Sequence, residues 1–264
     1  MYPILLQLGP ITIYALWICA AIGFFVTFLI IYKLLQKDRS ALAFLADNSL
    51  TLLFGGILAA RIAFVVENYK VYFSKLDLQH LLEILYIWDK GLSFWGGMVG
   101  VILVLIYLCK KHKENLWKWL DVITIGTMGG LVLGSLGRFL DGSNYGNETD
   151  LPWGVIIENS RYAVPIHPTQ IYAMIYTLAI TITLWNLKNT AFGKKEGNIT
   201  LVGTLCYAGF RFLEEFLRGD ESNYILGLRE GQIFCLLVLI IAGTHLYLRY
   251  RKAPKSSDST LKTT

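Results

Sequence analysis

The sequence has 264 residues, of which 55% are apolar and only 16% are charged. A soluble domain carries roughly 25% charged residues, so this composition and a mean hydropathy of +0.50 exclude a disordered chain and argue against a water-soluble globule. Aromatic residues make up 14%, and such rings concentrate where lipid meets water. The composition indicates an integral membrane protein.

The four cysteines add no further class of site. Cys19, Cys109, Cys206 and Cys235 lie in or at the ends of apolar runs, and no pair has C-x-x-C spacing. This pattern predicts small buried side chains, with neither a zinc site nor a disulfide framework. The first residues carry no basic charge and no cleavage pattern, so we expect the first apolar run to be retained as a membrane span.

Seven apolar segments are close to the roughly 20 residues that a helix needs to cross a bilayer. They cover 11–32, 47–66, 93–109, 119–140, 167–187, 198–217 and 232–248. We therefore expect an all-α integral membrane protein of seven transmembrane helices. Residues 1–251 would form a single membrane domain, and 252–264 a disordered cytoplasmic tail.

The basic residues predict the orientation of these helices. Lysine and arginine gather after the first, third, fifth and seventh segments, whereas the connection after the fourth is acidic. Because cytoplasmic loops hold the excess of positive charge, the N-terminus is expected outside and the C-terminus in the cytoplasm. The net charge of +5 thus reflects topology, and nucleic-acid binding is not expected.

Two outer connections are long. The first, 67–92, contains Leu78, Leu81, Leu82, Ile84 and Leu85, a pattern that predicts an amphipathic helix lying along the membrane interface. The second, about 141–166, combines glycine, asparagine, proline and acidic residues. We expect this second segment to form a cap or loop over the outer leaflet, and we call it the cap segment.

The sixth apolar segment carries charges where lipid is expected. Tyr207, Arg211 and Glu215 recur every fourth residue and therefore share one helix face, with Arg218 a turn further on. Charged groups inside a span cost roughly 2.5–3.5 kcal/mol each, so they often mark function. Arg211, held by Glu215, could offer its planar guanidinium to a lipid phosphate. The alternative is a salt bridge that only stabilises the helix bundle.

Three further positions place polar groups in or near the spans. Arg138 follows Gly137 and other glycines, which let a neighbouring helix or a ligand approach the backbone closely. The alternative is that the Arg138 side chain only extends to the outer membrane surface. Arg61 lies in the second segment, as a functional cation or as a structural hydrogen-bond donor. Residues 167–172 open the fifth segment, where His167, Gln170 and exposed backbone N–H groups favour an anion, unless they only cap the helix.

In order and spacing, the chain resembles the prolipoprotein diacylglyceryl transferases, bacterial membrane enzymes that lipidate the lipobox cysteine of preprolipoproteins. The resemblance extends nearly from end to end. The segments that carry it are 8–13, 60–65, 87–97, 150–155, 167–172, 207–218 and 231–232. It implies residence in the bacterial plasma (inner) membrane, and seven spans with the predicted orientation are also what this family has.

The resemblance implies a reaction in which the diacylglyceryl group of phosphatidylglycerol, or of a related anionic lipid, moves to a cysteine thiol in the lipobox of a prolipoprotein signal peptide. Glycerol phosphate leaves and a thioether forms, and neither a metal nor an organic cofactor is required. We expect the catalytic residues to be Arg211, which would hold the phosphate with support from Glu215 and Tyr207, and Arg138 as the second cation. The substrate-binding residues implied are His167, Gln170, Tyr172, Arg61, Gly137, Gln232 and Trp95.

Several positions depart from the family pattern. Trp95 replaces a histidine that is a candidate base, and Ser135 replaces an arginine that binds phosphate. Arg138 stands where the family has an asparagine. Since it lies about one turn beyond Ser135, its long side chain could serve the same pocket. The family's glutamate is Ser143. Asp141 or Glu215 could replace the base only if its pKa were tuned toward neutrality.

The sequence leaves three functions open. A divergent diacylglyceryl transferase is the main prediction. Because several family residues are replaced, a catalytically silent or re-purposed relative that binds anionic phospholipid or lipoprotein is the alternative. A small transporter would also hold intramembrane charges, but the two halves of the sequence show no inverted repeat.

Overall fold

The computed structural model describes residues 4–8, 11–73, 91–157 and 164–251. The chain divides into two compact units, each with its own packing. The first unit joins residues 1–33 to 120–264, and the second is residues 34–119. The single membrane domain expected over 1–251 stays a prediction, and the tail 252–264 lies outside the described residues.

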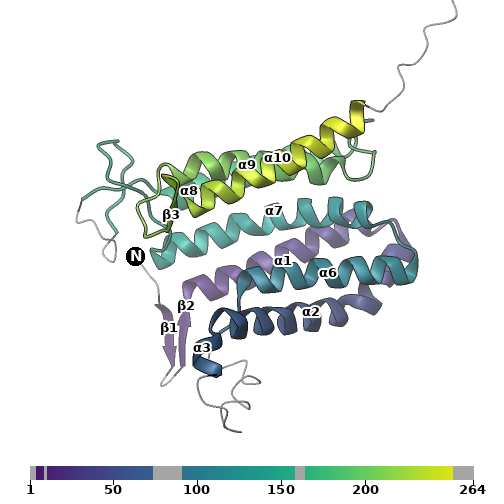
Figure 1. Cartoon of the computed structure of the whole chain (residues 1–264), viewed down its shortest axis with the longest axis horizontal. Helices are drawn as coiled ribbons and strands as arrows, with labels where there is room; N and C mark the ends of the chain where they lie inside the picture. The colour runs from purple at the N-terminus through teal and green to yellow at the C-terminus, as the bar shows by residue number, and fades with distance from the viewer. Residues whose placement is uncertain (1–3, 9–10, 74–90, 158–163, 252–264) are drawn as a thin grey trace, which may run out of the picture. The chain divides into compact units, whose positions relative to one another are not determined.

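Helices dominate the described chain (Figure 1). They are α1 (Ala15–Leu35), α2 (Arg39–Glu67), α3 (Tyr69–Tyr72), α6 (Phe94–His112), α7 (Leu116–Asp141), α8 (Thr169–Leu187), α9 (Asn198–Glu215) and α10 (Glu230–Arg251). Each predicted apolar segment is largely helical. Five helices, namely α1, α2, α7, α8 and α10, are long and apolar enough to cross a membrane. The structure therefore agrees with a helical membrane protein, and a count of seven spans stays a prediction.

The first predicted span begins too early. Residues Ile11–Tyr14 form strand β2, which pairs antiparallel with β1 (Ile4–Leu8), and α1 starts only at Ala15. The physical reason is local. Pro10 lacks the N–H that a helix needs, and the β-branched residues that follow favour an extended backbone. A second hairpin, β3 (Tyr224–Ile225) and β4 (Leu228–Arg229), joins α9 to α10. These two short hairpins are the only sheets among the described residues, and the structure is otherwise helical, as expected.

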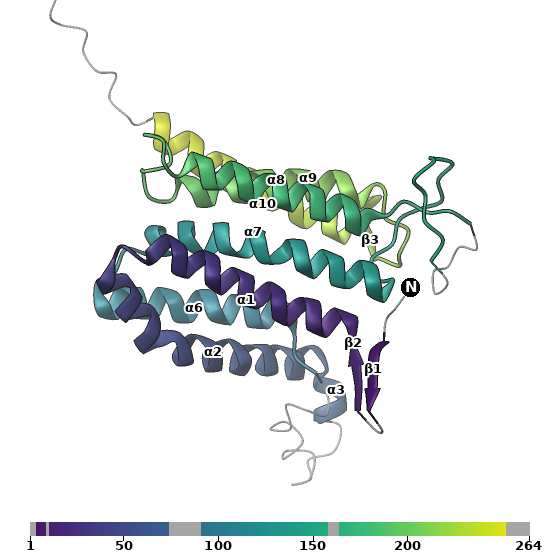
Figure 2. The ribbon, with the colours of Figure 1, turned by 180° about the vertical axis from the view of Figure 1, so that it is seen from behind.

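In the first unit, α8, α9 and α10 run side by side (Figures 1 and 2). The start of α9 is fixed by a carboxylate of α7, because Asp121 accepts hydrogen bonds from the backbone N–H groups of Gly197 and Thr200 at 2.6 and 2.7 Å. Helix α7 also packs closely on α1, where a Cβ added to Gly130 would lie 2.6 Å from the carbonyl oxygen of Gly23. Glycines therefore set how closely these two helices approach.

In the second unit, α2 and α6 pack along most of their length through small residues. A Cβ on Gly100 would lie 2.1 Å from the Cβ of Ala59. Ser93 caps α6 and accepts a hydrogen bond from the N–H of Gly96 at 3.3 Å, while its own N–H donates to Ala60 at 3.0 Å. Close contact between small residues is a common way for membrane helices to associate.

The cap segment is described except for residues 158–163, and no helix is found in its described part. It is held by short antiparallel bridges, which pair Gly146 with Arg218 and Ile166 with both Glu148 and Val155. These bridges join the end of α7, the start of α8 and the end of α9. The leucine-rich part of the predicted interfacial helix, 78–85, lies outside the described residues.

The close packing of α7 on α1 makes a prediction about stability. Gly130→Ala should lower the free energy of unfolding by about 1–3 kcal/mol, because the added methyl group overlaps backbone. The matched control is Gly134→Ala on the same helix, where nothing lies within 4 Å of the added atom. Thermal unfolding in detergent checks the pair, and equal effects of the two variants would contradict the packing argument.

Candidate functional site

A network of buried charges lies where α9 ends and α10 begins. Three guanidinium groups meet three carboxylates there. The arginines are Arg211, Arg218 and Arg229, and the acids are Glu214, Glu215 and Asp220. Such a set is stable in a medium of low dielectric constant only if each charge is paired.

Glu215 is the centre of this network, and its side chain is only 4% exposed. One carboxylate oxygen accepts from Arg211 at 2.5 Å and from Arg218 at 3.4 Å, and the other accepts from Arg229 at 2.8 Å. Gly231 lies against the same carboxylate, since a Cβ there would be 2.7 Å from Glu215 Oε1. Because its oxygens already accept from three cations, Glu215 is poorly placed to take a proton from a substrate.

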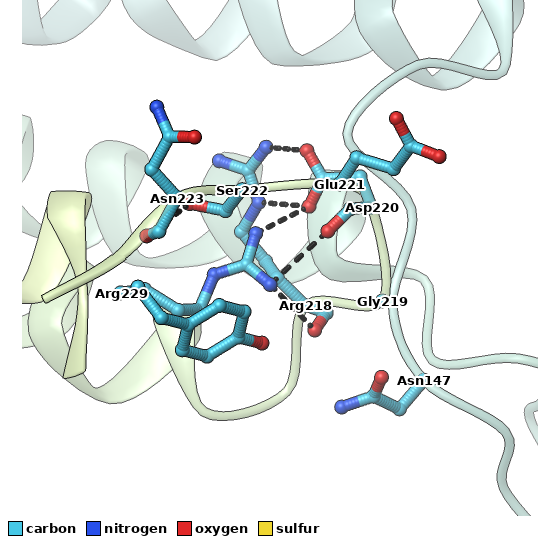
Figure 3. A pocket seen from close by; sticks show the side chains of 9 residues that line it. Asn147, Arg218, Gly219, Asp220, Glu221, Ser222, Asn223 and Arg229 are labelled. Carbon is cyan, nitrogen blue, oxygen red and sulfur yellow. Dashed lines mark hydrogen bonds and ion pairs between the residues drawn. The ribbon is translucent and has the colours of Figure 1, made fainter. Parts of the chain in front are cut away.

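Asp220 holds the other two arginines together. Figure 3 shows its carboxylate between the two guanidinium groups: it accepts from Arg218 Nε at 2.8 Å and from Arg229 Nη2 at 2.9 Å. Burial disfavours the charged form of Asp220, but the hydrogen bond and charge of Arg218 and the charge of Arg229 outweigh burial. They hold the pKa of this carboxyl below its ordinary value.

Arg211 is paired twice. Its guanidinium donates to Glu214 and to Glu215, so the i,i+4 pair predicted from the sequence is confirmed. Glu214 accepts in addition from the hydroxyl of Tyr176 on α8, at 2.8 Å. A guanidinium has five N–H donors, so Arg211 keeps donors for a further ligand. Two carboxylates nevertheless offset its charge.

Arg138 has a different environment. Its Nη2 donates to the hydroxyl of Ser135 at 3.0 Å, and among the described residues no carboxylate lies within ion-pair distance of it. Asp121 on α7 bonds Thr200 at the start of α9, so the two helices share a reference point. Arg138 lies about 25 Å further along α7 and Glu215 about 22 Å further along α9, which places both side chains at a similar depth in the helix bundle. The Tyr207 side chain interacts electrostatically with both Arg138 and Arg211. Tyr207 therefore lies near both arginines predicted to bind phosphate.

The polar start of α8 folds back on the cap segment. The hydroxyl of Tyr172 lies 3.3 Å from His167 Nδ1 and accepts from the indole N–H of Trp153 at 2.9 Å. Gln170 is 2% exposed, and its Nε2 donates to the carbonyl of Ser143 at 2.7 Å. The hydrogen bonds of Tyr172 and of the Gln170 amide nitrogen thus connect α8 to the cap segment.

The other predicted site residues have structural contacts. Gly137 lies against α1, where a Cβ would be 2.8 Å from Cys19 Cβ. Gln232 is buried and accepts from the N–H of Arg229 at 3.0 Å. Arg61, in the second unit, donates to the carbonyl of Gly91 at 3.0 Å and faces the rings of Phe64 and Tyr72. Trp95 is on α6, and its side chain lies outside what the structure describes.

Sequence reasoning missed three members of this network, Glu214, Asp220 and Arg229, and also Tyr176, which donates to Glu214. Glu214 adjoins Glu215, so its charge was a signal that could have been used. Arg229 and Asp220 lie in the connection between α9 and α10. The spacing of residues in a loop does not predict which of them meet. Only the folded hairpin brings Arg229 to Glu215.

The central position of Glu215 predicts a large loss of stability when its charge is removed. Glu215→Gln should lower the free energy of unfolding by about 3–5 kcal/mol, because three buried guanidinium groups lose a shared partner. Glu221→Gln is the matched control, since Glu221 is exposed and has no partner among the described residues. It should change stability by less than about 0.5 kcal/mol. Equal thermal stability of the two variants would refute the central role of Glu215.

The lowered pKa of Asp220 predicts a dependence on acid. A carboxyl with a depressed pKa in the folded state contributes stability above its unfolded pKa and loses it as pH falls through the folded value. Asp220→Asn should therefore unfold at a lower temperature than the unchanged protein at pH 7. The difference in unfolding temperature between the variant and the unchanged protein should narrow as pH falls below about 4. A difference that widens in acid would show that the pKa of Asp220 is raised.

Comparison with known proteins identifies the family. The sequence model of the prolipoprotein diacylglyceryl transferases matches residues 3–248. Proteins named phosphatidylglycerol–prolipoprotein diacylglyceryl transferase are similar over most of their length. One from Desulfotalea psychrophila is 35% identical over 230 residues, 84% of this chain and 82% of its own. Another, from Bordetella parapertussis, is 28% identical over 260 residues, 96% of each chain. The chain belongs to the prolipoprotein diacylglyceryl transferase family.

Proposed function

We propose that this protein transfers the diacylglyceryl group of phosphatidylglycerol to the thiol of a lipobox cysteine in a prolipoprotein, the first step of lipoprotein maturation. The family match and the names of the relatives support the reaction. The observation that carries the proposal to particular residues is the arrangement of Arg138, Arg211 and Tyr207 at one end of the first unit.

The proposed setting is the plasma membrane of a bacterium, with seven spans, an outer N-terminus and a cytoplasmic C-terminus. The basic residues support this orientation, because Lys110 and Lys111 end α6 and Arg249 and Arg251 end α10. In this orientation the charge network and the cap segment lie at the outer surface. The site would then meet the lipids of the outer leaflet and a signal peptide that has crossed the membrane.

Arg138 is proposed as the main cation for the lipid phosphate. A phosphate attracts a cation whose charge is not already offset, and no carboxylate pairs with Arg138 in the described part of the chain. The Ser135 hydroxyl orients its guanidinium at 3.0 Å. Gly134, one turn earlier on α7, has nothing within 4 Å of an added Cβ, which leaves space beside the same face for a lipid headgroup.

Arg211 and Tyr207 are proposed to complete the phosphate site. Arg211 keeps N–H donors beyond those used by Glu214 and Glu215, and the two acids hold its guanidinium in place. Tyr207 supplies a hydroxyl close enough to both arginines for their charges to act on it. Donors fixed before the reaction stabilise the charge that develops on a leaving group without reorganising.

The covalent step is a displacement at carbon. The cysteine sulfur forms a bond to the glyceryl carbon that carries the phosphate, and the bond between this carbon and the phosphate oxygen breaks. The electron pair of the broken bond stays on the departing glycerol phosphate, where Arg138 and Arg211 stabilise it. The thiol proton is proposed to end on this phosphate monoester, whose second pKa is about 6. No base is then required at the position of Trp95.

Transfer itself is the direct test of this function. The purified full-length protein, given phosphatidylglycerol and a lipobox peptide, should yield a thioether-linked diacylglyceryl peptide, which mass spectrometry detects. An active relative serves as the positive control. Stoichiometric retention of phospholipid without product would overturn the proposal and favour the catalytically silent alternative.

The residue-level proposal makes a separate prediction for Arg138. Arg138→Gln should lower kcat/KM by about 10²–10³, the usual effect of removing one preorganised group that stabilises developing charge. Arg138→Lys should retain part of the rate, since a lysine keeps the charge but cannot bind in a bidentate manner. The control is Arg251→Gln at the far end of α10, where the side chain is exposed. Full activity of Arg138→Gln would remove Arg138 from the site.

A further inference from the structure

A polar pocket opens beside the charge network, outside the apolar helices. It has a volume of about 560 Å³ and is lined by Asn147, Arg218, Gly219, Asp220, Glu221, Ser222, Asn223, Tyr224 and Arg229. Ligand pockets commonly have about 300–1,000 Å³. The lining comes from the cap segment, the connection after α9 and the second hairpin (Figure 3).

The charges around this pocket do not suit an anion. Both arginines in its wall are already paired, with Asp220 between them and Glu215 behind Arg229. The Glu221 carboxylate is turned away from these pairs (Figure 3), and it has no ion-pair partner among the described residues. The rim of the pocket thus carries an uncompensated negative charge. A phosphate or a free glycerol phosphate would be repelled there.

The polar groups left for a ligand suit a peptide. Asn147 offers a carboxamide whose only donation within the described part of the chain is a long one of 3.4 Å to the carbonyl of Phe216. The hydroxyl of Ser222 bonds its neighbour's carbonyl at 3.3 Å, also weakly. These groups and the Glu221 carboxylate can pair with the N–H and C=O groups of an extended backbone and with a cationic side chain.

The pocket is also at a suitable distance from the proposed reaction site. Glu215 bonds Arg211 through one oxygen and Arg229 through the other, at 2.5 and 2.8 Å. The guanidinium groups of the phosphate site and of the pocket wall are therefore separated by the width of one carboxylate. Two or three extended residues, at about 3.3–3.6 Å each, cover that distance.

We propose that this pocket binds the polar segment of the acceptor polypeptide that directly follows the modified cysteine. The inference rests on the proposed transfer reaction and adds a binding site for the acceptor to it. The pocket would favour acceptors that carry polar or basic residues after the cysteine. It would contribute to acceptor affinity and leave lipid binding unchanged.

The test compares two acceptor peptides with the full-length protein. The long acceptor continues for five polar residues beyond the lipobox cysteine, and the short acceptor ends as an amide directly after it. Ser222→Trp fills the pocket, and Glu221→Gln removes the charge at its rim. Glu148→Gln, an exposed acid of the cap segment that does not line the pocket, is the control.

Ser222→Trp should raise KM for the long acceptor about tenfold, toward the value for the short one. KM for the short acceptor, KM for phosphatidylglycerol and kcat should stay unchanged. Glu221→Gln should raise KM about threefold for a long acceptor with lysine after the cysteine, and less for one with serine. An equal effect on both acceptors, or a changed KM for phosphatidylglycerol, would overturn the inference.

A second measurement does not depend on turnover. A photo-reactive phenylalanine analogue placed at position 222 should cross-link to the residues after the cysteine of the long acceptor, and not to the short acceptor. If the unchanged protein transfers nothing, the proposed function fails, and the cross-link alone then decides whether the pocket binds the acceptor. Cross-linking only to the signal-peptide part would contradict the pocket assignment.

Discussion

One buried carboxylate organises the end of this protein where its chemistry is proposed. Glu215 accepts from three guanidinium groups that come from α9, from the turn after it and from β4. A carboxylate that is 4% exposed needs such partners, because an unpaired charge at this depth would cost several kcal/mol. The same bonds fix the second hairpin to the end of α9, so the wall of the polar pocket and the support of Arg211 depend on one side chain.

The network divides the local charges into two kinds. Arg211, Arg218 and Arg229 are balanced by Glu214, Glu215 and Asp220, so their charges attract an anion less strongly, although Arg211 keeps N–H donors for the phosphate. Arg138 is bonded to a serine hydroxyl, and its charge remains available. A lipid phosphate is therefore expected on the α7 side of Tyr207, and the acceptor backbone on the hairpin side of Glu215. This separation keeps two chemically different substrates apart until their reacting atoms meet.

The sequence alone could predict the periodic parts of this arrangement. Apolar runs located every long helix, because the hydrophobic signal is local, and the four-residue spacing of Arg211 and Glu215 predicted their ion pair. Contacts made across loops could not be predicted. Arg229 meets Glu215 only because the hairpin turns back at Leu226 and Gly227, both at positive φ. Gly137 was expected to let a neighbouring helix or a ligand approach closely, and among the described residues α1 packs there, against Cys19. Ile11–Tyr14 resembled the start of a span because an apolar strand and an apolar helix have the same composition.

A structure of the full chain in a nanodisc that contains phosphatidylglycerol tests the division between the two kinds of cation most directly. Phosphate density is expected within roughly 4 Å of the Arg138 guanidinium, next to Tyr207, with the three hydrogen bonds from Arg218 and Arg229 to Asp220 intact. Phosphate density between Arg218 and Arg229, with Asp220 displaced from them, would contradict this division.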